Sequence, residues 1–136
     1  MSSVRVVLVG IGGYGIHYVE ALLKRGAAHN VALCGVVDPY PEMFSRWPEL
    51  QQQGVPHYWQ LAEFYSRDTA DLAIIASPIQ FHAPQTTLAL QNGSAVQCEK
   101  PMCATIAEAH QMRDARDQAQ RLLAIGYQWS YAAPIL

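Results

Sequence analysis

Two things are missing from this chain of 136 residues: an excess of charge of one sign, and any long apolar run. The formal net charge is −2, and charged side chains make up 15% of the sequence. Because the basic residues are few and scattered, the sequence lacks the electrostatic footprint of a DNA- or RNA-binding protein. No apolar stretch approaches membrane-spanning length, and the one near the N-terminus is too short for a signal-peptide core. We therefore expect neither a nucleic-acid partner nor a membrane partner.

Cysteine is also scarce, since Cys34, Cys98 and Cys103 are the only three. Their spacing matches no metal-ligand pattern, so no metal site is expected. An odd number of thiols, two of them inside predicted strands, is typical of a reducing compartment, which predicts a cytoplasmic protein. Hydrophobic residues make up 51% of the chain, enough to bury the core of one ordinary domain.

The opening segment VRVVLVGIGGYG joins an apolar run directly to the pattern G-x-G-x-x-G. In this pattern the first glycine permits a tight turn and the second leaves room for a pyrophosphate. The third lets the following helix pack close to the strand. Backbone N–H groups and the positive end of the helix dipole then face the phosphates. The turn predicts dinucleotide binding by its six residues, which are Gly10, Ile11, Gly12, Gly13, Tyr14 and Gly15.

Asp38 stands at the end of a second apolar run, at 31–37, at the distance from the glycines that the dinucleotide fingerprint requires. A carboxylate at this point accepts both hydroxyls of the adenosine ribose and repels a 2′-phosphate. No Arg or Lys follows closely, so NAD is favoured over NADP. The alternative interpretation is local: Asp38 caps the next helix or begins a turn before Pro39.

Apolar runs alternate with helical patterns along the rest of the chain. Several of the runs are apolar on both faces, as in a parallel sheet covered by helices on both sides. We predict an α/β fold, a doubly wound Rossmann sheet of order 3-2-1-4-5-6. Strands are expected at 4–9, 31–37, 55–59, 71–76, 95–99 and 122–126. Helices are expected from the glycine turn to Gly26 and then at 41–50, 61–65 and 83–91, with a last one capped by Thr105.

Three local features sharpen this prediction. Pro48 is expected to interrupt the helix at 41–50. Thr105 and Glu108 form a capping-box pattern, followed by an apolar stripe predicted to face the core. The stripe consists of Ile106, Ala109, Met112, Ala115 and Ala119. At the C-terminus, aromatic residues alternate with polar ones over 127–131, which predicts another strand.

Ligands of such sheets bind at the carboxyl ends of the strands. The fourth strand leads into Ser77, Pro78 and His82, and the fifth into Glu99-Lys100-Pro101. A lysine beside the predicted cofactor can donate a hydrogen bond to a substrate oxygen, and dehydration would lower its pKa towards a working range. The alternative interpretation is that Lys100 pairs with Glu99 at the rim of the sheet, and His82 could simply help to cap a helix.

The motifs GIGGYG, ASPIQFH, CEKP and GYQ, together with Asp38, resemble the Gfo/Idh/MocA family of NAD(P)-dependent oxidoreductases in the order they occur. The resemblance implies that Lys100 contacts the reacting hydroxyl or carbonyl near the nicotinamide. It implies that Glu99 and Pro101 hold the lysine and shape the nicotinamide pocket. The segment with Ser77, Pro78 and His82 would border the cofactor, and Gln128 would lie near the nicotinamide.

The resemblance also implies a domain organisation and a reaction. Residues 1–126 would form the NAD(P)-binding domain and 127–136 would lead into a second, α+β substrate domain absent from this chain. The longer protein would be a homo-oligomeric dehydrogenase that transfers a hydride between nicotinamide and a carbinol or carbonyl of a sugar, cyclitol or similar polyol. This chain by itself is expected to be inactive. Two alternatives remain: a non-catalytic NAD-binding module, and a methyltransferase, which Glu-Lys-Pro and the glycine spacing disfavour.

Overall fold

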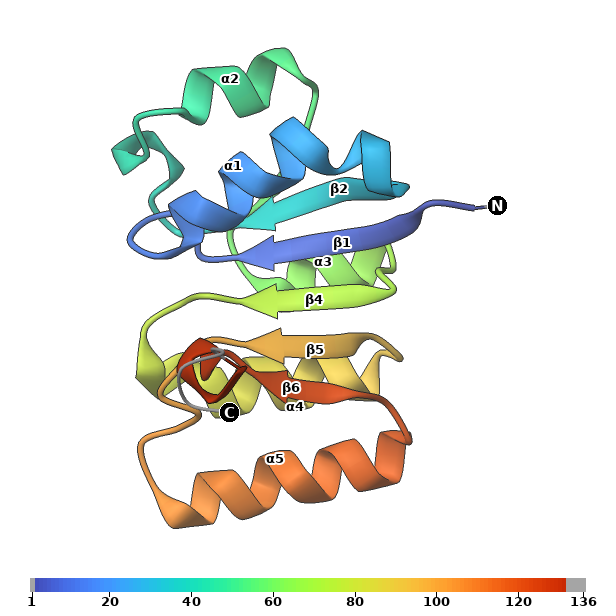
Figure 1. Cartoon of the computed structure of the whole chain (residues 1–136), viewed down its shortest axis with the longest axis vertical. Coiled ribbons are helices and arrows are strands. Elements are labelled where there is room, and N and C mark those ends of the chain that lie inside the picture. Colours follow the sequence, from blue (N-terminus) through green and yellow to red (C-terminus); the bar gives the residue numbers. More distant parts are fainter. Residues whose placement is uncertain (1, 132–136) are drawn as a thin grey trace.

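The computed structural model describes residues 2–131 as one six-stranded sheet between two layers of helices. The strand order is β3-β2-β1-β4-β5-β6, and every neighbouring pair is parallel, so all the arrows in Figure 1 point the same way. The predicted Rossmann fold and strand order are confirmed. The strands are β1 (Val4–Val9), β2 (Val31–Val37), β3 (His57–Tyr58), β4 (Leu72–Ile75), β5 (Ala95–Cys98) and β6 (Leu123–Ile125).

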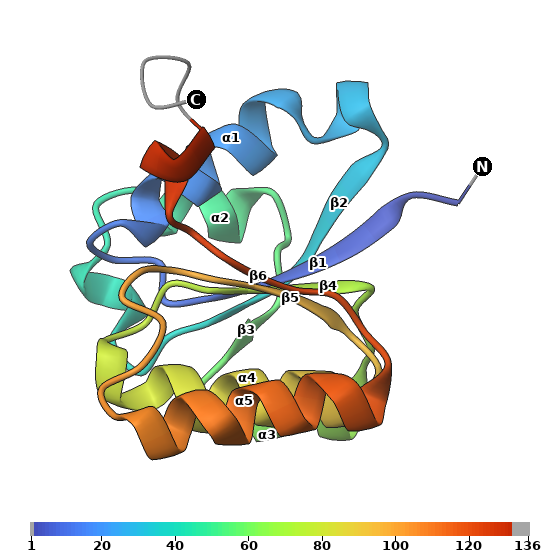
Figure 2. The ribbon, with the colours of Figure 1, turned by 60° about the horizontal axis from the view of Figure 1, so that its bottom comes forward.

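The two faces of the sheet are covered by unequal numbers of α-helices. Helices α1 and α2 lie on one face, and α3, α4 and α5 lie on the other (Figure 2). The α-helices are α1 (Gly15–Arg25), α2 (Trp47–Gln52), α3 (Leu61–Arg67), α4 (His82–Gln91) and α5 (Ile106–Ala119). Short 3₁₀ turns are η1 (Ala27–His29), η2 (Pro41–Met43), η3 (Ile79–Phe81) and η4 (Gln128–Tyr131).

The core has two halves, one on each face of the sheet. In β1, Val7 and Val9 pack with the α3–α5 layer, whereas Val6 and Leu8 pack with α1 and α2. All four of these side chains are at most 1% exposed. A central strand buried on both faces reads as a continuous apolar run, which explains why the pattern at the N-terminus predicted it correctly.

Helix α5 begins as predicted. The hydroxyl of Thr105 accepts a hydrogen bond from the Glu108 N–H, and the Glu108 carboxylate accepts one from the Thr105 N–H. The predicted stripe is wrong at Ile106, which is 77% exposed, while Met112 is fully buried. With 3.6 residues per turn, Ile106 lies about 120° around the helix from Met112, so it points away from α4.

The segment after β2 contains different elements from those predicted. Pro48 lies in the first turn of α2, as its second residue, and does not interrupt it, because proline lacks only an N–H that the first turn leaves unpaired. The predicted helix at 41–50 is therefore two elements, η2 and α2. The predicted strand at 55–59 shrinks to the two-residue β3 at the sheet edge, where only β2 is present to pair with it.

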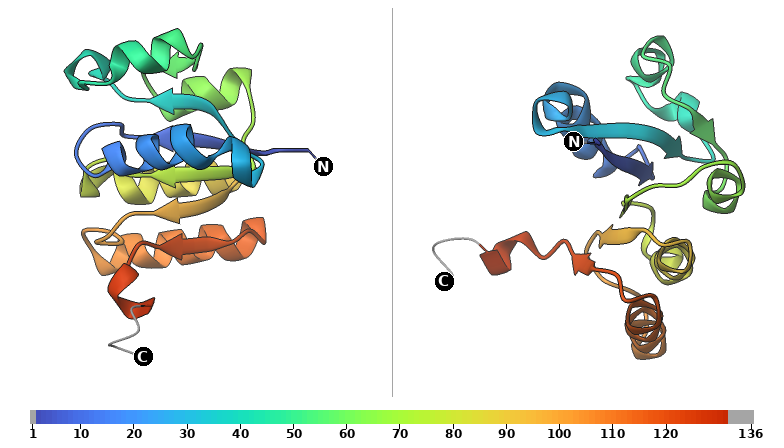
Figure 3. Two further views of the ribbon diagram at one scale, coloured as in Figure 1. Left: turned by 45° about the horizontal axis from the view of Figure 1, so that its top comes forward. Right: turned by 90° about the vertical axis from the view of Figure 1, so that its right-hand side faces the viewer.

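The predicted strand at 127–131 is wrong. Beyond β6 the chain forms η4, whose first turn is closed by the hydrogen bond from the Ser130 N–H to the Tyr127 carbonyl. Pairing between β5 and β6 ends at Cys98 and Ile125, so no neighbouring strand remains for a further strand to join. Figure 3 shows η4 projecting beyond β6 on the side away from α5. Residues 132–136 of the predicted lead-in lie outside the described residues.

Candidate functional site

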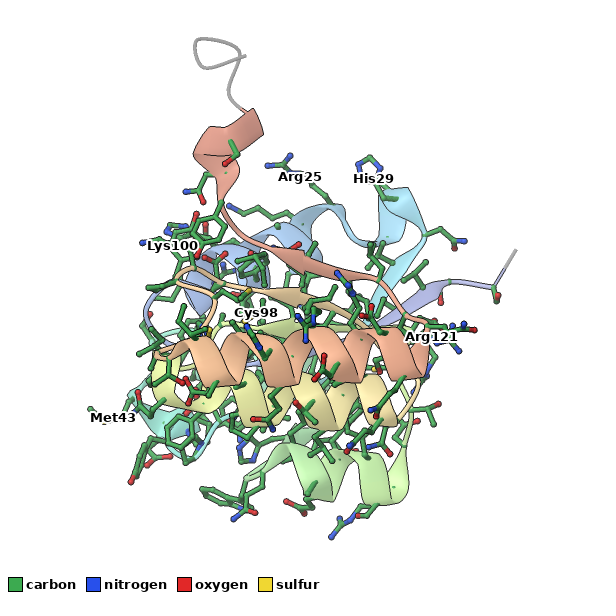
Figure 4. The ribbon with its side chains drawn as sticks, turned by 90° about the horizontal axis from the view of Figure 1, so that it is seen from below. Arg25, His29, Met43, Cys98, Lys100 and Arg121 are labelled. Carbon is green, nitrogen blue, oxygen red and sulfur yellow. The ribbon has the colours of Figure 1, made fainter. Side chains whose placement is uncertain are left out.

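A cleft of about 1030 Å³ runs along the edge of the sheet where the strands end. It is bordered by the turns that follow β1, β2, β4 and β5, so it brings together segments far apart in the sequence. Figure 4 shows Lys100 at this edge and Arg121 at the opposite one. Of the predicted site residues, all line the cleft except Ile11, Gly15 and Gln128.

The glycine turn is shaped by close backbone approaches. Gly10 has φ +85°, and a Cβ there would lie 2.7 Å from the Ala76 carbonyl oxygen at the end of β4. A Cβ on Gly15 would lie 2.0 Å from the Gly10 carbonyl oxygen. Gly12 is different, because a Cβ there would meet nothing within 4 Å. The first and third glycines are thus required by the fold, while the second leaves its space open to the cleft.

Backbone N–H groups are the polar groups that this turn offers. No acceptor within residues 2–131 takes the N–H groups of Gly12, Gly13 and Tyr14, which precede the first turn of α1. The positive end of the α1 dipole lies behind them. The Tyr14 ring packs edge-on against His17 and Tyr18 of the same helix while remaining 46% exposed at the cleft. The arrangement suits an anion.

Asp38 forms hydrogen bonds within its own turn and to the glycine turn. Its Oδ1 accepts a hydrogen bond from the Tyr40 N–H at 2.8 Å, which forms the local turn. Its Oδ2 accepts one from the Ile11 N–H at 3.0 Å, which ties the end of β2 to the glycine turn. The Nε2 of His57 lies 2.8 Å from the Asp38 carbonyl oxygen. The carboxylate is therefore held at the cleft by two backbone N–H groups, while His57 contacts the main chain of Asp38.

The turn after β4 holds a buried histidine. His82 is 2% exposed and begins α4, but its side chain does not cap that helix. Its Nε2 lies 2.8 Å from the Ser77 carbonyl oxygen, and its Nδ1 lies 2.9 Å from the Pro101 carbonyl oxygen. The ring thereby joins the ends of β4 and β5. The Ser77 hydroxyl donates a hydrogen bond to Gln85 in α4.

Glu99, Lys100 and Pro101 follow β5. The Glu99 side chain is buried, whereas Lys100 is exposed at the cleft. The Glu99 Oε2 accepts a hydrogen bond from the backbone N–H of Lys100 at 3.1 Å, and the Lys100 ammonium forms no ion pair with any residue from 2 to 131. The alternative interpretation, in which Lys100 is a rim residue paired with Glu99, is not what the structure shows.

Three predicted residues lie elsewhere. The Ile11 side chain is fully buried in the core on the α1 side, and only its N–H serves the site, through Asp38. Gly15 is buried at the start of α1. Gln128 lines a separate, smaller hollow of about 340 Å³, which it shares with Tyr14, Tyr18 and Glu99.

Sequence reasoning missed Tyr18, His57 and Trp59. Tyr18 donates a hydrogen bond to Glu99, His57 contacts the backbone of Asp38, and Trp59 lines the cleft with 58% of its surface exposed. For Trp59, its place directly after a strand was an available signal, because strand ends border the site. For Tyr18 no signal existed, since its partner is 81 positions away in the sequence.

The cysteines and the other metal-ligating residues add no reactive centre among the described residues. Burial raises the pKa of the Cys34 thiol to about 11 and that of Cys98 to about 12, so neither is an activated nucleophile. Among the residues that the structure describes, no cluster of His, Cys, Asp or Glu could hold a metal ion. In the same part of the chain, every helix is too short or too polar to cross a membrane.

Known proteins share this fold and sequence pattern. The family described as the oxidoreductase family with NAD-binding Rossmann fold, Gfo/Idh/MocA, matches residues 4–127. A solved structure of the WlbA dehydrogenase from Chromobacterium violaceum, in complex with NADH and UDP-GlcNAcA, is 25% identical with a TM-score of 0.86. The alignment covers 99% of this chain and 38% of the WlbA chain.

Two further relatives extend the comparison. Scyllo-inositol dehydrogenase from Lactobacillus casei, solved with NAD(H) and scyllo-inositol, has a TM-score of 0.84 at 19% identity, with 97% of this chain and 38% of that one covered; at this identity only the fold is shared. An alpha-N-acetylgalactosaminidase of Shewanella oneidensis is 27% identical over 130 residues, 89% of this chain and 28% of that protein. The chain thus spans well under half the length of its relatives. It belongs to the Gfo/Idh/MocA oxidoreductase family, as the family's NAD-binding Rossmann domain.

Proposed function

We propose that this chain binds NAD for a longer dehydrogenase that moves a hydride between nicotinamide and a carbinol or carbonyl carbon of a sugar, cyclitol or similar polyol. The observation that carries the proposal is the placement of Lys100 and the glycine turn on one cleft. The family is NAD-binding, and relatives of this fold are sugar and inositol dehydrogenases. Residues 127–136 would lead into the substrate domain, and the longer protein would form a homo-oligomer.

The residues present fit the cofactor. Gly12 leaves open space where a side chain would otherwise stand, and three N–H groups face it without acceptors among the described residues. We assign the pyrophosphate to this turn, from Gly10 to Gly15. We assign the adenosine ribose to Asp38, whose carboxylate repels a 2′-phosphate and favours NAD over NADP. Ser77, Pro78 and His82 would border the cofactor, and Gln128 would lie near its nicotinamide end.

The chain's own contribution to the reaction would come from Lys100. When bound, NAD supplies the redox chemistry by accepting or giving the hydride. The exposed side chain of Lys100 would form a hydrogen bond with the substrate oxygen and orient it. Its ammonium form donates to a carbonyl oxygen, and its neutral amine accepts the proton that alcohol oxidation releases and relays it to a second group. Glu99 and Pro101 hold this lysine in position. The second proton-transfer group would lie in the substrate domain, so the chain alone binds cofactor without turning over.

Titration with NADH and NADPH tests the proposal. We expect calorimetry to show NADH binding, with NADPH at least about tenfold weaker. Gly12→Ala should lower NADH affinity by about tenfold or more while the free energy of unfolding stays unchanged, because the new methyl group enters only the cleft. Absence of binding by the folded chain would refute the proposal.

Lys100→Ala separates catalysis from binding. Because Lys100 is exposed and forms no ion pair within 2–131, NADH affinity should stay within about threefold. In the longer protein, turnover should fall about a hundredfold or more. Near-normal turnover would remove Lys100 from the mechanism. Turnover that is absent from the longer protein with every polyol, with NADH still bound, would favour a non-catalytic NAD-binding module.

A further inference from the structure

Glu99 is a buried carboxylate, 6% exposed, at the point where β5 ends beside α1 and β6. Each of its oxygens accepts one hydrogen bond. Oε1 accepts from the Tyr18 hydroxyl at 2.5 Å, and Oε2 accepts from the Lys100 N–H at 3.1 Å. A buried carboxylate needs such donors, because an unsatisfied charged oxygen is costly away from water. Tyr18 is thus the side chain that holds Glu99.

Gly126, which follows β6, lies close to this carboxylate. A Cβ on Gly126 would lie 2.9 Å from Oε1 and 3.1 Å from Oε2 of Glu99. The carboxylate also borders the smaller hollow that it shares with Tyr18 and Gln128. A side chain at Gly126 would therefore displace the group that accepts the Lys100 N–H.

Tyr18 is suited to be a permanent donor. Burial, followed by the hydrogen bond and the charge of Glu99, raises the pKa of the Tyr18 hydroxyl above its usual value. The hydroxyl therefore stays protonated and keeps donating. On the other side of Lys100, the Pro101 carbonyl oxygen lies 2.9 Å from His82. The Lys100 N–H is thus held by its neighbour Glu99, and the carbonyl of the next residue, Pro101, is held by His82 of α4.

We propose that Tyr18 is a positioning residue for Lys100, acting through Glu99. Its hydroxyl fixes the carboxylate, and the carboxylate fixes the backbone N–H of Lys100 at the end of β5. Tyr18 itself does not line the larger cleft onto which Lys100 opens. The importance of Lys100 for the reaction rests on the proposed function, whereas the hydrogen-bond chain can be tested without cofactor.

Amide hydrogen exchange at Lys100 is the first test. In Tyr18→Phe we expect exchange of the Lys100 N–H to accelerate about tenfold relative to that of Val96 within β5. Tyr65→Phe is the matched control. Tyr65 is also half-buried and lies in α3, outside the cleft, with its hydroxyl 2.6 Å from the Ser94 hydroxyl. It should leave the Lys100 exchange rate unchanged.

A second variant approaches the same carboxylate from the opposite side. Gly126→Ala keeps Tyr18 but displaces Glu99, so it should also accelerate Lys100 exchange relative to Val96. Equal acceleration at Val96 and Lys100 in Tyr18→Phe would show general destabilisation and would overturn the proposal. Unchanged Lys100 exchange in the folded Tyr18→Phe variant would overturn it as well.

The side chain of Lys100 gives an independent readout, because Lys24 and Lys100 are the only lysines in the sequence. After reductive methylation with ¹³C-formaldehyde, the Lys100 signal should shift in Tyr18→Phe while that of exposed Lys24 stays in place. A Lys100 signal identical to wild type would count against the proposal. NADH titration of the same samples keeps the two ideas apart: a wild-type chain that fails to bind NADH refutes the proposed function and leaves the exchange result standing.

Discussion

The two halves of the cleft differ in the groups that line them: backbone groups dominate one half and side chains the other. Around β1 and β2, the site consists of backbone N–H groups, open space at Gly12 and one carboxylate, Asp38. Around β4 and β5, it consists of side chains: Lys100 is exposed, and hydrogen bonds hold Glu99 and His82 to other segments. In the first half, close approaches of the backbone shape the site. In the second half, hydrogen bonds between side chains and other segments shape it.

The two halves should therefore respond to different kinds of substitution. A backbone site fails when a new atom enters the turn, because the neighbouring carbonyls cannot move aside without distorting the strands. A side-chain site fails when a partner is removed, because a buried polar atom loses its hydrogen bond. Substitutions in each half test this distinction between a backbone site and a side-chain site.

Gly15→Ala should have the largest effect on stability. Its Cβ would lie 2.0 Å from the Gly10 carbonyl oxygen, so α1 must shift away from β1. We expect the free energy of unfolding to fall by about 3 kcal/mol or more, measured by urea denaturation. Gly12→Ala, with its Cβ in open space, is the control that should keep full stability. A stable Gly15→Ala variant would show that the first half is more adaptable than its backbone contacts indicate.

His82→Leu should cost less but should act in the second half. The substitution leaves the Ser77 and Pro101 carbonyl oxygens without the ring that bridges them. We expect a loss of about 2 kcal/mol in thermal or urea unfolding. His110→Leu, at an exposed position of α5, should change stability little. If both variants behaved alike, the bridge between β4 and β5 would not hold the second half together.

The smallest expected difference between the two halves is in the rate at which their cysteines react with iodoacetamide. Cys34 lies in β2 and Cys98 in β5, with pKa values raised by burial to about 11 and about 12. A raised pKa leaves less thiolate, so at about pH 8 iodoacetamide should label both at least about a hundredfold more slowly than a free thiol. As the pH rises, Cys34 should become reactive first. Labelling of Cys98 before Cys34 would contradict the tighter burial of β5, and mass spectrometry reads the order.

The local parts of the fold could be predicted from the sequence. The apolar run at β1 and the capping box at Thr105 are signals between near neighbours, and both are confirmed. The prediction was wrong where a neighbouring element decides. Pro48 lies in the first turn of a helix, Ile106 faces solvent, and the segment after Tyr127 forms η4 because β5 offers no further pairing.

The sequence by itself determined the glycine turn and the position of the acid that follows β2, because each depends on residue type at short spacing. It predicted the order of the strands through the alternation of strand and helix patterns, which is typical of a doubly wound sheet. Only the tertiary structure decided how Lys100 is held. The carboxyl end of β5 is contacted from three other segments of the chain, by Tyr18, His82 and Gly126. Contacts between such distant residues produce no periodic pattern in the sequence. They exist because parallel strands end at one edge, which collects distant residues into one place.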